Sequence, residues 1–204
     1  MFSRRNLMIL LVIFICFANL SFANVINNAK LVVVIPSENF RDEELFSVKE
    51  MLEQAGVTVK IASSTLSHVK GMLGGSYTPE MLVTDINAKD FDGIVFIGGT
   101  GAVEYWNSIV AYQKINDFNA QNKLIAAICI APVILANAGV LKSKNATVFP
   151  TEAERIESKG AKYTGSIVEI DGNIITADGP DSSKEFAFRI LGWLKSNIKV
   201  YETQ

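Results

Sequence analysis

Residues that build disulfide scaffolds and metal clusters are scarce in this sequence. It holds one histidine, His68, and two cysteines, Cys16 and Cys129, among 204 residues. A disulfide framework needs several paired cysteines, and a zinc site needs clustered cysteine and histidine ligands. The sequence therefore predicts neither a disulfide framework nor a zinc site, and no pattern in it indicates a metal or another cofactor.

An excess of positive charge is also absent. The 19 basic and 21 acidic residues give a formal net charge of −2, whereas a nucleic-acid-binding face needs clustered Lys and Arg. A composition with 49% hydrophobic and 20% charged residues excludes a disordered, collagen-like or coiled-coil chain. With no internal repeat and no low-complexity linker, the sequence predicts one domain and no nucleic-acid partner.

The first 23 residues carry the pattern of an export signal. Arg4 and Arg5 form a positive start, residues 7–17 form a short apolar run, and residues 21–23 (SFA) offer a cleavage site. This pattern predicts a secretory signal peptide over residues 1–23 and a periplasmic or secreted protein. The strongly apolar run favours the ordinary secretory route over the twin-arginine route, and an uncleaved membrane anchor is the alternative.

Cleavage after Ala23 would leave residues 24–204 as a single domain with no membrane association. Cys129 would then be its only cysteine, because Cys16 leaves with the signal. A lone thiol in an oxidising compartment must be sheltered, or it is there to react. Cys129 is therefore the leading candidate for chemistry.

Apolar β-branched runs alternate with helical patterns along the rest of the chain. Short, fully apolar runs are typical of parallel strands buried on both faces. We expect strands over residues 31–35, 57–62, 94–97, 124–128, 167–170 and 174–176, and helices over residues 43–55, 108–120, 132–138 and 151–159, with a last helix from Ser182 or Ser183 through Ile198. This alternation predicts a doubly wound α/β sandwich.

Some local details follow from the same patterns. Asp42 is expected to cap the first helix, and residues 151–154 (TEAE) to form a capping box. Residues 63–88 are punctuated by glycines and predict a hairpin and a short helix. The loops after the first, third and fourth strands carry Glu44, Gly98-Gly99 and Cys129, and they should meet at the carboxyl edge of the sheet.

Cys129 lies between a strand and a helix that begins almost at once. This strand–turn–helix arrangement is that of a nucleophile elbow, which projects a side chain towards the ligand crevice. The free N–H groups and the dipole of the helix would favour thiolate, so we predict a thiol pKa below its ordinary value. The alternative is an inert cysteine buried in the core.

Four segments resemble motifs of the ThiJ/PfpI (DJ-1/PfpI) family and occur in the family's order. They are residues 40–45 (FRDEEL), 90–99 (DFDGIVFIGG), 126–132 (AAICIAP) and 171–180 (DGNIITADGP). The resemblance extends over nearly all of residues 30–198. It implies a flavodoxin-like fold, similar to class I glutamine amidotransferases, and the predicted signal makes the chain an exported, bacterial-type member.

The resemblance also implies roles for four residues. Cys129 matches the family's reactive cysteine, and Glu44 matches the glutamate whose protonated carboxyl hydrogen-bonds the sulfur. Gly99 and Ile130 match positions whose backbone N–H groups form an oxyanion-type pocket. Two anions in one pocket repel, so the pKa of Glu44 should be raised, which suits a general acid or base. The alternative for Glu44 is a first-turn carboxylate that serves the helix dipole.

The sequence departs from the family pattern in places that bear on function. Protease-like and some glyoxalase members carry His directly after the cysteine, where this chain has Ile130, and His68 lies outside every motif. Peptidase activity through a Cys–His pair is therefore disfavoured. Asp178 replaces an Arg or another non-acidic residue, which weighs against anionic substrates. Tyr105 and Trp106 are expected to pack in the core, or to wall a pocket or a dimer contact.

Two classes of function follow. In the first, Cys129 adds to a small reactive carbonyl compound such as methylglyoxal and Glu44 moves the proton, as in a glyoxalase or deglycase. In the second, the protein is not an enzyme, and Cys129 is a redox sensor or protective thiol that reacts with an oxidant. A binding domain with a vestigial site is a third alternative. The resemblance implies a homodimer in each case.

Overall fold

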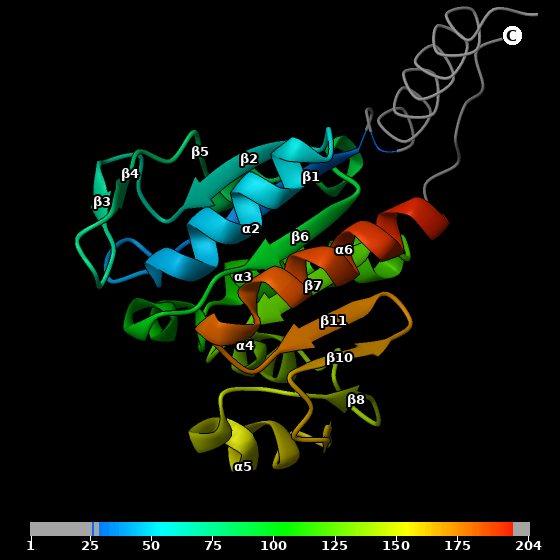
Figure 1. Ribbon diagram of the computed structural model, residues 1–204. Coiled ribbons are helices and arrows are strands. Elements are labelled where there is room, and N and C mark those ends of the chain that lie inside the picture. Colours follow the sequence, from blue (N-terminus) through cyan, green and yellow to red (C-terminus); the bar gives the residue numbers. More distant parts are fainter. Residues whose placement is uncertain (1–25, 27–28, 198–204) are drawn as a thin grey trace, which may run out of the picture.

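The structure is a computed structural model that describes Ile26 and residues 29–197. Its centre is a seven-stranded sheet with the order β10-β11-β7-β6-β1-β2-β5 (Figure 1). The strands are β1 (Lys30–Val34), β2 (Thr58–Ser63), β5 (Met81–Leu82), β6 (Gly93–Phe96), β7 (Leu124–Ile128), β10 (Val168–Asp171) and β11 (Ile174–Ala177). All neighbours are parallel except β10 and β11. The predicted signal peptide lies outside the described residues.

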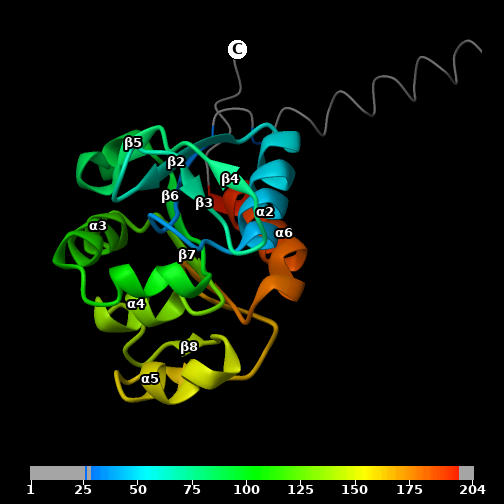
Figure 2. The same ribbon diagram turned by 90° about the vertical axis from the view of Figure 1, so that its left-hand side faces the viewer.

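Helices cover both faces of this sheet. Helices α2 (Asp42–Gln54) and α6 (Ser183–Asn197) pack together on one face, and α3 (Ile109–Ala120) and α4 (Pro132–Asn137) cover the other (Figures 1 and 2). The short α5 (Ala153–Glu157) packs against α4. The predicted doubly wound, flavodoxin-like α/β sandwich is therefore confirmed.

The central strands are apolar on both sides. Leu31 and Val33 of β1 pack into the core beneath α2 and α6, whereas Val32 and Val34 pack into the core on the α3 side. Successive side chains of a strand point to opposite faces. A strand must therefore be apolar at successive positions to fill the cores on both faces of the sheet, and residues 31–34 of β1 form this continuous apolar run.

The strand order creates the crevice that holds the candidate site. β1 pairs in parallel with β2 on one side and with β6 on the other. The chain therefore leaves β1 towards one face and β6 towards the other, and their loops diverge at the carboxyl edge. β7 lies beside β6, so the loop after β7 borders the same crevice.

The segment between β2 and β6 contains the expected hairpin, formed by β3 (Val69–Lys70) and β4 (Ser76–Tyr77). In place of the expected short helix there are two 3-10 turns, η1 (Val83–Asp85) and η2 (Ala88–Asp90). Strands β8 (Asn145–Ala146) and β9 (Lys162–Tyr163) form a separate parallel pair. Among the residues that the structure describes, no helix is both long and apolar enough to cross a membrane.

The predicted cap of α2 is wrong. Asp42 is the first residue of the helix, and Arg41 occupies the N-cap position without a side-chain cap. The Asp42 carboxylate instead accepts the N–H groups of Leu73 and Gly75 at 2.8 and 2.6 Å. The loop between β3 and β4 passes over the start of α2. Its backbone N–H groups donate to the Asp42 carboxylate, which is therefore not hydrogen-bonded to the N–H groups of the helix.

The predicted capping box at residues 151–154 is also wrong. A 3-10 turn, η4 (Pro150–Glu152), leads into α5, and Glu152 at the N-cap makes no side-chain cap. The Thr151 hydroxyl donates to the Glu152 carboxylate at 3.0 Å. The tight turn that starts with Pro150 moves the N-cap from Thr151 to Glu152, so the capping geometry does not form.

Candidate active site

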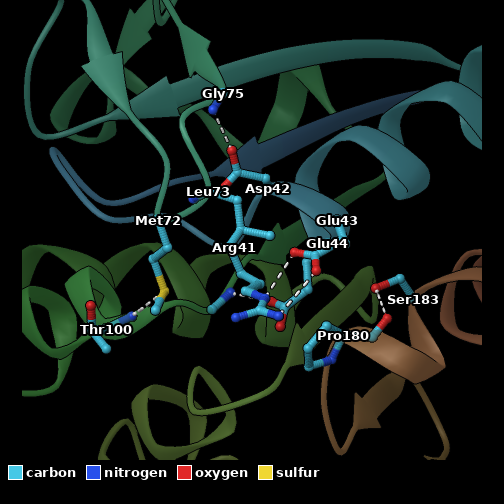
Figure 3. A network of polar contacts seen from close by, with 11 residues as sticks. Arg41, Asp42, Glu43, Glu44, Met72, Leu73, Gly75, Thr100, Pro180 and Ser183 are labelled. Carbon is cyan, nitrogen blue, oxygen red and sulfur yellow. Dashed lines mark hydrogen bonds and ion pairs between the residues drawn. The ribbon is translucent and has the colours of Figure 1, made fainter.

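Three loops at the carboxyl edge of the sheet bring the candidate residues together. Glu44 lies in the first turn of α2, Gly98 and Gly99 follow β6, and Cys129 follows β7. The Arg41 backbone N–H donates to the Gly98 carbonyl at 3.1 Å, which ties the first two loops to each other. Figure 3 shows Glu44 beside Arg41 and Glu43 at the start of α2.

Cys129 has the backbone of a nucleophile elbow. Its φ is 63°, a left-handed conformation that a residue with a side chain rarely adopts. Two hydrogen bonds hold the strained residue in place. Its N–H donates to the Ala177 carbonyl of β11 at 3.0 Å, and its carbonyl accepts the Phe149 N–H at 2.8 Å.

The glycine loop leaves no room for side chains beside Cys129. A Cβ on Gly98 would lie 2.6 Å from the Cys129 Cβ and 2.9 Å from Glu44 Oε2. Gly99 has a φ of 94°, and a Cβ there would lie 2.5 Å from the Arg41 nitrogen. Both glycines are therefore required for the backbone to approach the sulfur and the carboxyl this closely.

Glu44 is fully buried, with 0% of its surface exposed. Its Oε2 accepts the Gly98 N–H at 2.8 Å, and its buried Oε1 has no hydrogen-bond partner among the residues that the structure describes. Burial raises the pKa of Glu44 from 4.5 to about 7, although the Gly98 N–H and the Cys129 thiol oppose this rise. The expected rise is confirmed, but its main cause is loss of water rather than repulsion between two anions.

Cys129 does not have the lowered pKa that the sequence predicts. The residue is only 8% exposed, and burial together with the neighbouring Glu44 raises the pKa of the thiol to about 12. Hydrogen bonds from the backbone N–H groups of Gly99 and Ile130 act in the opposite direction. The helix that follows contains only the six residues of α4, and its N–H groups do not outweigh the loss of water.

Cys129 and Glu44 behave as one titrating unit because their acidic groups are in contact. Above pH 7 the pair holds one proton, which lies on the sulfur because the pKa of the thiol is the higher of the two. Transfer of this proton to Glu44 produces a thiolate that the N–H groups of Gly99 and Ile130 stabilise. The arrangement suits a thiol that is activated by a general base during reaction.

The four residues predicted for the site are thus neighbours, and their catalytic roles stay predictions. His68, in contrast, is exposed on the hairpin, with its Nδ1 3.0 Å from Thr78 Oγ1. Asp178 is half-buried, and its backbone N–H donates to the Ile167 carbonyl at 3.1 Å. Within residues 29–197, no group of three His, Cys, Asp or Glu side chains is placed to hold a metal ion.

Comparison with known proteins identifies the family. Residues 29–192 match the DJ-1/PfpI family. The chain belongs to this family. It is similar to an uncharacterised protein of Methanocaldococcus jannaschii, with 42% identity over 83% of this chain and 84% of that protein. It is also similar to the solved ThiJ/PfpI domain protein of Brachyspira murdochii, with a TM-score of 0.81 and 33% identity over 83% of this chain and 98% of that one.

A DJ-1/PfpI relative with a named activity is more distant. The glutathione-independent glyoxalase DJR-1.2 of Caenorhabditis elegans is 28% identical over 82% of this chain and 89% of that protein. The relatives therefore include an archaeal and an animal protein. These similarities do not show that the chain is the bacterial-type family member that the sequence analysis expected. The expected export likewise stays a prediction.

The structure adds contacts of two residues, Arg41 and Asp42, that sequence reasoning missed. The Arg41 guanidinium lies 2.8 Å from the Glu43 carboxylate and lowers the pKa of Glu44 by its charge. Asp42 binds the hairpin loop, which places the Met72 sulfur 3.4 Å from the Thr100 nitrogen beside the glycine loop (Figure 3). A signal for the Asp42 contact was available, since glycines 71 and 75 have no side chain to collide with this carboxylate.

Proposed function

We propose that this protein acts on small reactive carbonyl compounds through Cys129 and Glu44, in a reaction of the glyoxalase or deglycase type. The observation that supports it is the contact between a buried thiol and a buried carboxyl whose pKa is raised to about 7. A general base is most effective when its pKa lies near the working pH. The similarity to a relative named as a glyoxalase supports the same class.

The proposed reaction with methylglyoxal needs no external oxidant. The Cys129 sulfur bonds to the aldehyde carbon while Glu44 takes the thiol proton, and Glu44 then returns this proton to the former carbonyl oxygen to give a hemithioacetal. Glu44 then carries a proton from the former aldehyde carbon to the neighbouring ketone carbon. The hydroxyl proton moves to the ketone oxygen in the same isomerisation, so the first carbon is oxidised to a thioester and the second is reduced to an alcohol. Water cleaves the thioester, releasing lactate and the thiol.

The backbone supplies the rest of the proposed site. The N–H groups of Gly99 and Ile130 face the sulfur and are placed to stabilise negative charge that develops there or on an adjacent oxygen. Neither Cys129 nor Glu44 contacts a histidine, since His68 lies on the hairpin. Proton transfer in this site therefore depends on Glu44, and peptidase chemistry through a Cys–His pair is not part of the proposal.

Lactate formation from methylglyoxal tests this function. The purified protein should produce lactate, and Cys129→Ser should reduce the rate at least about a hundredfold, because a serine hydroxyl is far less readily deprotonated than a thiol. Glu44→Gln should reduce it by a similar factor. Conversion at an unchanged rate in Cys129→Ser would refute the proposal.

A redox role is the second candidate, and the Glu44 carboxyl beside the Cys129 sulfur supports it. At 8% exposure, the thiol is reached by peroxide more easily than by a large reagent, and a sulfinate oxygen would accept the Glu44 proton. Mild peroxide should then add two oxygen atoms to Cys129, each from one peroxide molecule that is reduced to water. An unmodified thiol in the mass spectrum would exclude this role.

We also propose export and a homodimer, on separate grounds. Export is supported by the sequence pattern of residues 1–23, and intact mass of the protein recovered from its natural host should show cleavage after Ala23. The homodimer is supported by the family resemblance, and sedimentation should give twice the mass of the chain. A full-length mass or a monomer would refute the respective proposal.

A further inference from the structure

The backbone around Ile130 has an additional support from a distant part of the chain. The Ile130 N–H faces the Cys129 sulfur, and its carbonyl accepts two hydrogen bonds. One comes from the Val133 N–H at 3.3 Å and belongs to the turn into α4. The other comes from the indole Nε1 of Trp106, also at 3.3 Å and 24 residues away in the sequence.

Trp106 is itself fixed from several elements. Its carbonyl accepts Asn137 Nδ2 of α4 at 2.7 Å and the Tyr112 hydroxyl of α3. The Arg155 guanidinium of α5 lies 4.9 Å from the centre of the indole ring, a cation–π contact. The ring is only half-buried, so packing alone does not account for this degree of anchoring.

We propose that Trp106 is a positioning residue for the Cys129 thiol, because its indole N–H holds the Ile130 carbonyl and so keeps the Ile130 N–H aimed at the sulfur. The backbone at Cys129 has a left-handed φ of 63°, and its own two hydrogen bonds hold Cys129 but not the next residue. A contact that fixes Ile130 therefore adds to the support of this strained turn. The proposal rests on the proposed function only in taking Cys129 as the reacting group.

The test compares two tryptophan variants in the full chain. Trp106→Phe keeps an aromatic ring and removes the N–H. Trp193→Phe is the matched control, because its Nε1 also donates to a backbone carbonyl, that of Gly172 at 2.9 Å, far from the site in the fold. Alkylation of the Cys129 peptide by iodoacetamide is followed by mass spectrometry across pH, which separates it from Cys16.

Trp106→Phe should slow alkylation at pH 7 about fivefold, the factor that corresponds to one net hydrogen bond. Its alkylation midpoint should move to higher pH, because the Ile130 N–H lowers the pKa of Cys129. Trp193→Phe should match wild type. Wild-type rates and midpoint in Trp106→Phe would overturn the proposal.

A second measurement decides the matter if Trp106→Phe folds poorly. The chain has two tryptophans, so Trp193→Phe leaves Trp106 as the sole indole fluorophore. Its emission should change when Cys129 is alkylated, and unchanged emission would overturn the proposal. Neither measurement uses a carbonyl substrate, so a protein that makes no lactate yet shows both effects refutes the proposed function and leaves the role of Trp106 standing.

Discussion

Glu44 makes a quantitative prediction about the pH dependence of stability. In the unfolded chain its carboxyl titrates near 4.5, whereas in the folded protein burial raises its pKa to about 7. Below pH 4.5 the carboxyl is protonated in both states, and its contribution to stability is fully present. Between pH 4.5 and 7 the unfolded chain releases this proton while the folded protein keeps it, so folding becomes less favourable as the pH rises. The loss of stability is complete once the pH has risen through 7.

The size of the effect follows from the shift. Each unit of pKa corresponds to about 1.4 kcal/mol, so wild type should lose about 3 kcal/mol relative to Glu44→Gln between pH 4 and pH 8. Glutamine has nearly the same shape, accepts the Gly98 N–H through its oxygen and does not titrate. The difference between the two proteins therefore isolates this one carboxyl.

Urea unfolding of both proteins at several pH values measures this difference. Glu50→Gln is the matched control, because Glu50 is an exposed carboxylate on the same helix, and this variant should follow wild type at every pH. A difference between wild type and Glu44→Gln that stays constant within about 1 kcal/mol would show that Glu44 is not held protonated by burial, and the reasoning on the site would fail.

Further predictions concern the backbone around the site. Gly99→Ala and Gly74→Ala both place a side chain at a φ of 94°, but only Gly99 is crowded, with the Asn39 carbonyl 2.3 Å from the new Cβ. Gly74→Ala should cost about 1 kcal/mol for the left-handed backbone, and Gly99→Ala about 1–3 kcal/mol more; equal values in urea unfolding would contradict the tight approach. Asp42→Asn should cost about 1–3 kcal/mol, because one loop N–H loses its acceptor. It should also speed proteolysis in residues 71–75, and an unchanged cleavage rate would show that the carboxylate does not hold this loop.

The strands were predictable because each has a local cause. Runs such as residues 31–35 and 124–128 are wholly apolar, and a parallel strand between two helical layers requires that composition. The Asp171-Gly172 turn likewise fixes the pairing of β10 and β11 by its own conformation. Local sequence also placed Glu44, the glycine loop and Cys129 after their strands, and the topology of such sheets brings those strand ends together.

Other features depend on segments that are far apart. The cap predicted for Asp42 failed because donors more than 30 residues away, at Leu73 and Gly75, bind the carboxylate. No local sequence pattern predicts that the loop between β3 and β4 will cross the start of α2. The hydrogen bond from Trp106 to Ile130 also depends on distant segments, since the indole N–H reaches its acceptor only after the two loops have packed together.

The amino-acid sequence by itself determined which residues stand at the carboxyl edge, because strand and helix patterns are local and parallel strands joined by helices end at the same edge of the sheet. Only the tertiary structure decided the acidity of those residues. The charge on Cys129 and Glu44 depends on how much water the surrounding helices remove and on which N–H groups remain within reach, and both are set by the whole fold.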